Sequence, residues 1–491
     1  MSIEIRGPVR VRFAPSPTGF LHLGGVRTAI YNDLLRQHAG GAFILRIEDT
    51  DKERSDDAMT RQIQSALEWI GVAWDEGPFL QSERMPRHHE RAEELLAAGK
   101  AYRCFCTTEE LDRQRAEAQA KGLVFRYPRT CLHRPQPETD ALRASGTPFV
   151  VRFQMPDDHI RFTDIVRGDM DFPPEALDDF ILLRSDGTPT YHMSVVVDDI
   201  DMRISHVIRG EDHLSNTPKH IPLFEALGGS VPTFAHLPLI LGPDKKRLSK
   251  RYGATSVEEF RNEGMLPQAL YNFMALLGWS PGDDQEILAR GEMIALFDVN
   301  RLNASAAVFD REKLLWMNAQ YMSKLTMDDI REPLQPFLAA AGLLDQDPVR
   351  LEAALELHRS RSRTLKELAE QVIPYFHDLP DYDPAACAKF LKDPGLPALL
   401  KELRDRWAGL ASFTKDALEA ELRSLCEAHG VKAGVLIHPT RMALSATTGG
   451  PPLFDLVEVM GREIALGRLD RFIAFLSALS AGPVDAPLPG A

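Results

Sequence analysis

Residues 13–25, FAPSPTGFLHLGG, have the composition of a loop that binds phosphate. The stretch contains three glycines and two prolines, follows the alternating VRVRF and precedes the helical pattern VRTAIYNDLLRQH. Glycines let the backbone approach a ligand, and N–H groups at a helix N-terminus attract anions. His22 can donate a hydrogen bond to a phosphate oxygen. Taken alone, the stretch is equally well explained as a proline-rich turn, because it lacks the GxxxxGK[ST] and GxGxxG patterns.

A second candidate for phosphate chemistry is DKKRLSKR, residues 244–251, which places five cations around one serine. Charge runs of this kind are usually solvated faces. Here the run follows an apolar strand pattern and has Gly242, Pro243 and Gly253 at its edges, as a loop would. Together with the first loop, more than 200 residues upstream, it predicts a clamp that closes on a triphosphate.

A third candidate is a metal site. Cys104 and Cys106 lie one residue apart, as do Cys131 and His133. Three cysteines and a histidine suit tetrahedral Zn²⁺ in a closed, structural site. The alternative is two ordinary pairs of reduced cysteines, since Cys-x₂-Cys is the commoner zinc spacing. Cys387 and Cys426 are isolated in the sequence and are expected to serve packing.

The sequence predicts a βαβ unit around the first of these residues. It consists of a strand at VRVRF, a helix over 26–38 and a strand at AFILRIEDTD. Helices follow near 58–70 and 87–98. Residues 101–190 read as an α+β insertion with strands at PFVVRFQM and FILLRSDG, and VVVDDIDMRISHVIRGED then has strand-like character. From about residue 256 the apolar spacing is helical. The tail SAGPVDAPLPGA is predicted to be disordered.

Bulk properties narrow the class of protein. A chain of 491 residues requires about three to four domains. The net charge of −14 argues against a general polyanion binder, although local basic patches remain compatible with a nucleic-acid partner. No apolar run reaches the length of about 18 residues that a membrane helix needs, and MSIEIRGPVRV lacks the pattern of a secretory signal. Five cysteines do not form a disulfide framework. We therefore expect a reduced, cytoplasmic protein that does not contact membranes.

Several motifs in the same order resemble one enzyme family. PSPTGFLHLGG resembles the first signature of the class I aminoacyl-tRNA synthetases, and RLSKR resembles the second. FILRIEDTD, SDGTPTYH, VIRGEDHLSNTP, LSKRYGATSV and DREKLLWMNAQY are similar to the bacterial glutamyl-tRNA synthetases in particular.

The resemblance implies an α/β fold: a Rossmann-type catalytic domain with an α+β insertion, followed by a mostly α-helical half. The expected divisions are the catalytic domain at 1–100 and 191–255, and a connective insertion at 101–190 that binds the tRNA acceptor end and holds the zinc site. They continue with a stem-contact domain at 256–326, an anticodon-binding domain at 327–480 and the tail at 481–491.

The activity implied by the resemblance is two-step ligation. ATP, accompanied by Mg²⁺, reacts with L-glutamate to give glutamyl-adenylate, and the glutamyl group then passes to the terminal adenosine of tRNA(Glu). Members of the family typically need bound tRNA before the first step. The implied partners are tRNA(Glu), L-glutamate and ATP. One structural Zn²⁺ in the insertion and a monomeric state are also expected.

The resemblance also assigns residues. It implies catalytic roles for His22 and Lys250, which would stabilise the phosphates and hold the departing pyrophosphate. The expected ATP-binding residues are Pro15, Ser16, Thr18, Gly19, His22, Gly24, Gly25, Asp212, Arg247, Leu248, Ser249, Lys250 and Arg251. The expected glutamate-binding residues are Arg12, Ser16, Glu48, Tyr191 and Arg209. Arg12 and Tyr191 are expected to bind the side-chain carboxylate, Arg209 the α-carboxylate, and Glu48 with Ser16 the ammonium group.

Three positions depart from the class pattern. Gly25 replaces the second histidine of the first signature, as is usual in the glutamate branch, and Arg247 replaces the first lysine of the second. Val195 stands where some members have an asparagine that touches the substrate, so we expect no polar contact there.

The basic stretch HRSRSRTLKE, residues 358–367, is the best candidate for anticodon contact. Arg361 falls at a position that some relatives use to read the anticodon and to separate tRNA(Glu) from tRNA(Gln). A helix-surface charge run is the alternative interpretation of this stretch. At the level of function, a non-discriminating enzyme that also charges tRNA(Gln) and an inactive tRNA-binding paralogue both remain open, although the joint presence of Arg12, Glu48, Arg209 and Lys250 favours catalysis.

Overall fold

The computed structural model describes residues 7–50, 57–248, 256–379, 381–383, 387–388, 390 and 393–480. The chain divides into two compact units. The N-terminal unit comprises residues 1–261 and 267–314, and the C-terminal unit comprises residues 262–266 and 315–491. The tail that the composition predicts to be disordered, 481–491, lies outside the described residues.

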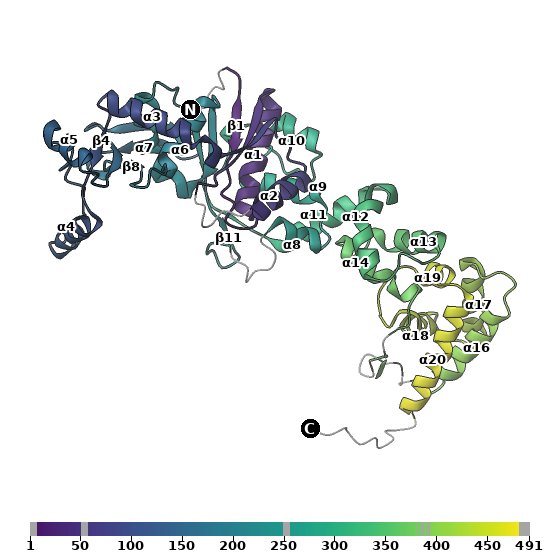
Figure 1. Ribbon diagram of the computed structural model, residues 1–491. Helices are drawn as coiled ribbons and strands as arrows, with labels where there is room; N and C mark the ends of the chain where they lie inside the picture. The colour runs from purple at the N-terminus through teal and green to yellow at the C-terminus, as the bar shows by residue number, and fades with distance from the viewer. Residues whose placement is uncertain are drawn as a thin grey trace, which may run out of the picture. The chain divides into compact units, whose positions relative to one another are not determined.

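The N-terminal unit contains the predicted βαβ unit, which is confirmed. Strands β1 (Arg10–Phe13), β2 (Ala42–Ile47) and β3 (Glu76–Leu80) form a parallel sheet in the order β1-β2-β3. Helix α1 (Leu23–Ala39) connects β1 to β2 and ends at Gly40, whose φ of 66° is the left-handed conformation that glycine adopts without strain. Helix α2 (Asp57–Ile70) follows β2 along the chain, and α3 (Met85–Ala97) follows β3 (Figure 1).

A second sheet has the order β7-β6-β10-β9. Strands β9 (His206–Gly210) and β10 (Thr233–Leu237) are parallel, β6 (Ile160–Asp164) is parallel to β10, and β7 (Gly168–Phe172) is antiparallel to β6. The backbone of Ser205 donates to the carbonyl of Arg10, 2.9 Å away, so β1 and β9 begin side by side. Helix α7 (Thr217–Ala226) connects β9 to β10.

The region expected to be an insertion contains an antiparallel sheet of β4 (Ala101–Cys104), β5 (Val150–Phe153) and β8 (Ile181–Leu183). The strands predicted at PFVVRFQM and FILLRSDG are therefore confirmed. Helices α4 (Thr108–Ala120) and α5 (Gln136–Ala144) follow β4 along the chain. Strands β6 and β7 also fall within 101–190, but β6 pairs with β10 of the second sheet.

One expectation is wrong. The run YHMSVVVDDID forms the helix α6 (Tyr191–Asp201) rather than a strand, and only HVIRG forms β9. The valines misled the prediction because their β propensity is weak evidence when a segment is buried on all sides. Residues 193–199 of α6 are all buried.

The C-terminal part of the chain is helical, as predicted. The N-terminal unit has α8 (Val257–Asn262), α9 (Pro267–Leu276), α10 (Arg290–Leu296) and the start of α11 (Arg311–Lys324), with a short pair of strands β11 (Ile240–Leu241) and β12 (Ala307–Val308). The C-terminal unit contains α12 (Met327–Ala340), α13 (Pro348–Arg359), α14 (Leu365–Val372), α16 (Leu396–Ala408), α17 (Lys415–His429), α18 (Gly434–Ser445), α19 (Leu453–Met460) and α20 (Arg462–Ser480).

Arginine side chains join these helices by donating hydrogen bonds to carbonyl groups at helix ends. Arg350 donates to the carbonyls of Val459 and Met460 at the end of α19, and Arg462 donates to Ala408 at the end of α16. Cations at helix C-termini satisfy the last carbonyls and complement the helix dipole. Among the described helices, none combines the length and apolar character needed to cross a membrane.

Candidate active site

A cavity of about 830 Å³ lies in the N-terminal unit, at the carboxyl ends of the parallel strands. The last residues of β1 and β9, Glu48 just after β2 and Pro238 just after β10 all line it. Ligands of open α/β sheets bind at this edge. Every position expected to bind glutamate or ATP that the structure describes lines this one cavity: Arg12, Pro15, Ser16, Thr18, Gly19, His22, Gly24, Gly25, Glu48, Tyr191, Arg209, Asp212, Arg247 and Leu248.

The first loop fixes the orientation of His22. His22 is the N-cap of α1, and its Nδ1 accepts a hydrogen bond from the backbone N–H of Gly25 at 3.1 Å. Burial, and then the charge of Arg247, lower the pKa of His22. The neutral ring that accepts at Nδ1 must carry its proton on Nε2. His22 is therefore held as a hydrogen-bond donor at the N-terminus of a helix, where anions bind.

Side chains at the two glycines that follow His22 would meet close neighbours. A Cβ at Gly25 would lie 2.8 Å from Cδ1 of Leu21, and a Cβ at Gly24 would lie 3.1 Å from the His22 ring. A side chain at either position would therefore require Leu21 or His22 to shift.

The two candidate phosphate segments meet in space. The backbone of His22 forms a bridge with Ser256, and the N–H of Val257 donates to the carbonyl of Leu21 at 3.3 Å. Within the basic stretch, Arg247 and Leu248 line the same cavity as His22. Ser249, Lys250 and Arg251 lie outside the described residues. The described residues on either side of this gap, Leu248 and Ser256, thus lie beside the first loop.

Two buried guanidinium groups line the cavity. Arg12 is 4% exposed and Arg209 is 6% exposed. Arg12 donates through Nε to Asp199 at 3.3 Å, and no described side chain accepts from its two terminal nitrogens. Arg209 donates to His236, Tyr191 and Thr217 and to the carbonyl of His213. No carboxylate in the described part of the chain forms an ion pair with Arg209. A buried cation without a counter-ion is costly, so this site favours an anionic ligand.

Acidic groups lie beneath Arg12. Glu48 follows β2 and is held by its backbone N–H, which donates to the carbonyl of Pro15 at 3.0 Å. Burial raises the pKa of Glu48, although the charges of Arg46 and Arg12 oppose this effect. Arg46 itself is fully buried and pairs with Asp199 at 2.6 Å and with Glu48 at 3.3 Å. The cavity therefore has a carboxylate beside its two cations.

Several residues of this network were missed by sequence reasoning. Arg46, Asp198 and Asp199 are buried charges that hold the site from below. Burial alone would raise the pKa of Asp198, but hydrogen bonds and charge from His88, Arg46 and Arg84 lower it to about 2. His213 also lines the cavity, and its Nδ1 lies 2.9 Å from the hydroxyl of Tyr191. Its place in the motif VIRGEDHLSNTP was the only available signal.

Val195 is buried in α6 and does not line the cavity among the residues described.

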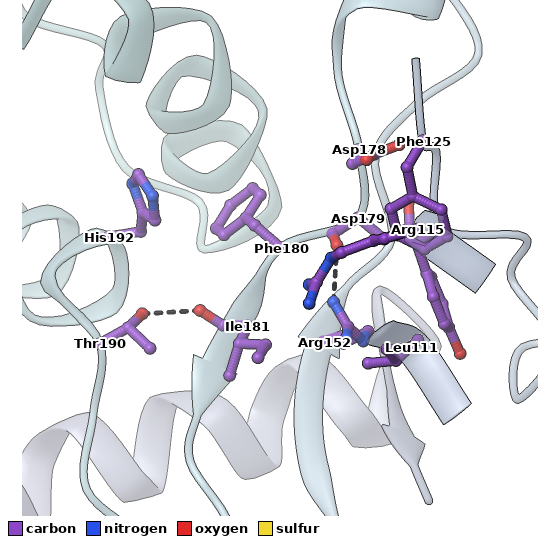
Figure 2. A pocket seen from close by; sticks show the side chains of 11 residues that line it. Leu111, Arg115, Phe125, Arg152, Asp178, Asp179, Phe180, Ile181, Thr190 and His192 are labelled. Atoms are coloured by element: carbon purple, nitrogen blue, oxygen red, sulfur yellow. Dashed lines mark hydrogen bonds between the residues drawn. The ribbon is translucent and has the colours of Figure 1, made fainter. Parts of the chain in front are cut away.

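A second cavity, of about 450 Å³, lies next to the first. Thr190 and His192 line it, whereas Tyr191 between them lines the larger cavity. Figure 2 shows Phe180 and His192 on one side of the space and Arg115, Phe125 and Arg152 on the other. Thr190 Oγ1 donates to the carbonyl of Ile181 at 2.6 Å, and Arg152 donates to the carbonyl of Asp179 at 3.0 Å. Aromatic rings and guanidinium groups together suit stacking with nucleic-acid bases.

The histidine at the border of the two cavities makes stability depend on pH. Burial, and then the charges of Lys219 and Arg209, lower the pKa of His192 to about 4. Its Nδ1 lies 3.0 Å from Nε2 of His220. The unfolded chain protonates this histidine near pH 6.5. Between pH 6.5 and 4 the unfolded state therefore binds more protons, and stability falls as pH falls.

For this reason we expect the free energy of unfolding to decrease by about 2 kcal/mol between pH 7 and pH 5 through His192 alone. In a His192→Asn variant, which keeps a polar atom near the position of Nδ1, the decrease should be smaller by that amount. Urea unfolding followed by circular dichroism at the two pH values measures this. An identical pH dependence in both proteins would refute the assignment.

The candidate metal site is partly assembled. The Sγ atoms of Cys104, Cys106 and Cys131 all lie within 4.8 Å of one another. A hydrogen bond with Cys104 holds the pKa of the Cys131 thiol at about 4. His133 is exposed and does not belong to this group of described residues. Instead, the hydroxyl of Tyr127 lies 3.2 Å from Sγ of Cys104 and 3.6 Å from Sγ of Cys106. Sequence spacing did not single out Tyr127.

Arg361, the anticodon candidate, lies in the C-terminal unit just after α13. Its side chain is exposed. Burial is the largest cause of the lowered pKa values of His358 and Arg441, and the charge of Arg361 lowers both further. Arg361 therefore lies close enough to both side chains to interact with them electrostatically.

Comparisons with known proteins agree with this geometry. A family described as "tRNA synthetases class I (E and Q), catalytic domain" matches residues 8–316, and one described as "Anticodon binding domain" matches residues 329–473. The chain is 46% identical to "Glutamate--tRNA ligase 2" of Koribacter versatilis, over 96% of this chain and 99% of the relative. It is 45% identical to "Glutamate--tRNA ligase" of Moorella thermoacetica, over 94% of this chain and 97% of the relative.

A solved structure is also similar. The glutamate tRNA ligase of Elizabethkingia meningosepticum, crystallised in complex with its amino acid, matches with a TM-score of 0.88 and 37% identity, over 96% of this chain and 100% of that chain. The chain therefore belongs, over nearly its whole length, to the glutamate–tRNA ligase family of class I tRNA synthetases.

Proposed function

We propose that this protein activates L-glutamate with ATP and transfers the glutamyl group to the 3′-terminal adenosine of tRNA(Glu). The observation that carries the proposal is the single cavity that places two buried guanidinium groups beside a phosphate-type loop. Family membership supports the same reaction.

Activation is an in-line attack of the substrate carboxylate on the α-phosphate of ATP, which enters with Mg²⁺. The α-phosphate–oxygen bond to pyrophosphate breaks as the bond to glutamate forms. Because negative charge spreads over the phosphates, catalysis depends on positioned donors. We assign the Nε2–H of His22 and the guanidinium of Arg247 to the phosphates. Lys250, outside the described residues, is assigned to the departing pyrophosphate.

Recognition of glutamate requires two cations and one anion. Arg209 is assigned to the α-carboxylate, and Arg12 with the hydroxyl of Tyr191 to the side-chain carboxylate. Glu48 and Ser16 are assigned to the ammonium group. A guanidinium group can bind a carboxylate through two parallel hydrogen bonds. The free terminal nitrogens of Arg12 fit this role among the described contacts.

We assign the tRNA contacts to two regions. The second cavity, lined by Arg115, Phe125 and His192, is assigned to nucleotides of the acceptor end, because it adjoins the cavity where the terminal adenosine must react. Arg361 in the C-terminal unit is assigned to the anticodon. Single-stranded bases are recognised by stacking and by hydrogen bonds to their edges.

Zinc is proposed for the cysteine group. Three thiols so close together fit a tetrahedral zinc site, and a nearby phenol oxygen can complete it. Cys104, Cys106, Cys131 and Tyr127 would hold the ion, and His133 would not be required. Bound zinc would stabilise the fold of the insertion. The Tyr127 ring also contacts the guanidinium group of Arg152, whose central carbon lies 4.2 Å from the ring centre. Since both residues line the second cavity, the cysteine group supports one of its walls.

The zinc assignment predicts about one equivalent of metal in the purified protein. Cys131→Ser should lose most of it, Tyr127→Phe should bind it more weakly, and His133→Ala should retain it. Elemental analysis after dialysis against a weak chelator measures each. Loss of metal from His133→Ala with retention in Tyr127→Phe would contradict the proposed fourth ligand, and no metal in the unmodified protein would remove the site altogether.

The function is tested by charging purified tRNA(Glu) and tRNA(Gln) separately with labelled glutamate. The proposal predicts efficient labelling of tRNA(Glu). Labelling of tRNA(Gln) at a similar rate would identify a non-discriminating enzyme. Failure to label either tRNA, with folded protein and ATP present, would favour an inactive tRNA-binding protein.

A further inference from the structure

Behind Arg209 lies a buried pair of side chains that no step of the proposed reaction uses. Asp164 ends β6 and His236 lies on the adjacent strand β10, and both side chains are completely buried. Oδ2 of Asp164 lies 2.6 Å from Nδ1 of His236. On the other side of the ring, Nε2 of His236 accepts a hydrogen bond from Nε of Arg209 at 3.0 Å. The three residues form one line that ends in the cavity.

The bonding of Asp164 fixes the state of the histidine. Oδ1 of Asp164 accepts from the backbone N–H groups of Val166 and Arg167 at 2.9 Å and from that of His236 at 3.3 Å. Oδ2 is left to accept from His236, so the proton of the neutral ring sits on Nδ1. Nε2 is then an acceptor, which is the state that the N–H of Arg209 requires. Burial is the largest cause of the lowered pKa of His236, which keeps the ring neutral.

The choice of acceptor matters for the charge of Arg209. A carboxylate in the place of His236 would orient the guanidinium equally well, but it would also neutralise the guanidinium and compete with an anionic ligand. A neutral imidazole orients the group and adds no negative charge beside it. The remaining contacts of Arg209, with Thr217, Tyr191 and the carbonyl of His213, are also with neutral groups.

We propose that Asp164 and His236 are positioning residues, which hold Arg209 in the orientation that binds the substrate carboxylate without neutralising its charge. The inference rests on the proposed role of Arg209 in binding glutamate. It assigns to β6, a strand within the region expected to be an insertion, a part in amino-acid recognition.

Two substitutions at position 236 test whether a neutral acceptor orients Arg209. His236→Gln offers a neutral carbonyl oxygen near the position of Nε2 and should change the KM for glutamate by less than about 5-fold, since a neutral hydrogen bond is retained. His236→Leu removes the acceptor and adds no charge; it should raise the KM for glutamate by about 10- to 100-fold, because the Nε–H of Arg209 is then buried without its partner. The KM for ATP should be unchanged in both.

A third substitution tests the ring state. In Asp164→Asn the amide oxygen should still accept the hydrogen bonds of the three backbone N–H groups. The amide NH₂ would then face Nδ1 of His236. The neutral ring must then place its proton on Nε2, against the N–H of Arg209. We expect the KM for glutamate to rise by about 10- to 100-fold, because two buried donors face each other. His206→Gln, a buried histidine on β9 that contacts Ser205, is the matched control and should leave the KM unchanged.

The experiment is glutamate-dependent ATP–pyrophosphate exchange in the presence of tRNA(Glu), with thermal unfolding to confirm that each variant folds. Equal KM values for glutamate in His236→Gln and His236→Leu would overturn the inference, as would an unchanged KM in folded Asp164→Asn. If Asp164→Asn does not fold, the comparison of the two variants at position 236 still tests the inference. If the unmodified protein shows no glutamate-dependent exchange, the proposed function fails instead.

Discussion

Replacing Arg209 with leucine is expected to lower kcat/KM for glutamate by about 10⁴-fold, the scale seen when a site built for a polar substrate group is mismatched. The side chain is buried and forms no ion pair with any described carboxylate. Without it, the α-carboxylate of glutamate would enter the cavity unpaired and next to Glu48. Arg209→Lys should recover only part of the loss, because an ammonium group cannot replace a planar fork of donors.

Steady-state exchange kinetics with varied glutamate measure this effect. Arg87→Leu is a suitable control, because Arg87 forms partly exposed ion pairs with Asp201 and Glu90 and such pairs contribute little. A loss of less than 10-fold in folded Arg209→Leu would contradict the assignment of Arg209. A rise in the KM for ATP of the same size as that for glutamate would also contradict it.

The second large effect is expected from His22→Asn, which should lower the rate of adenylate formation by about 10²- to 10³-fold. Asparagine is a good N-cap and can accept the hydrogen bond of the Gly25 N–H, so α1 should keep its stability. It has no group that reaches the position of Nε2. The variant therefore removes the donor to phosphate and leaves the cap in place. Single-turnover AMP formation measures the chemical step.

His38→Asn, in the last turn of the same helix and exposed, is the control for a general effect on α1. If His22→Asn keeps the wild-type rate, His22 has no role in stabilising the phosphates. If the thermal midpoint falls while the rate per folded molecule is unchanged, the histidine serves only as a helix cap.

The local parts of the site could be predicted because local sequence determines them. The loop before α1 and the end of α1 at Gly40 each depend on neighbours a few residues away. Parallel strands place their carboxyl ends together, and the cavity lies at such ends. The βαβ unit was predicted from the sequence, whereas Arg12, Glu48 and Arg209 were assigned to one ligand through the family resemblance.

The supporting network could not be predicted in the same way. Arg12 meets Asp199 across 187 residues of sequence, and Asp164 meets His236 across 72. No local pattern encodes such partners. In addition, Asp199 lies on α6, a segment whose run of valines led to the wrong prediction of a strand. Near the cysteines, spacing pointed to His133, whereas the fold of that segment brings Tyr127 to the sulfurs and leaves His133 exposed.

The central claim is that one cavity joins ATP to a doubly anionic amino acid. It is tested most directly by ATP–pyrophosphate exchange in the presence of tRNA(Glu), with glutamate, glutamine and aspartate compared one at a time. We predict exchange with glutamate and at least 10³-fold slower exchange with the other two, because glutamine leaves Arg12 without an anion and aspartate is too short to reach both guanidinium groups (about 10⁴ is typical of such mismatches). Exchange with glutamine as fast as with glutamate would contradict the account.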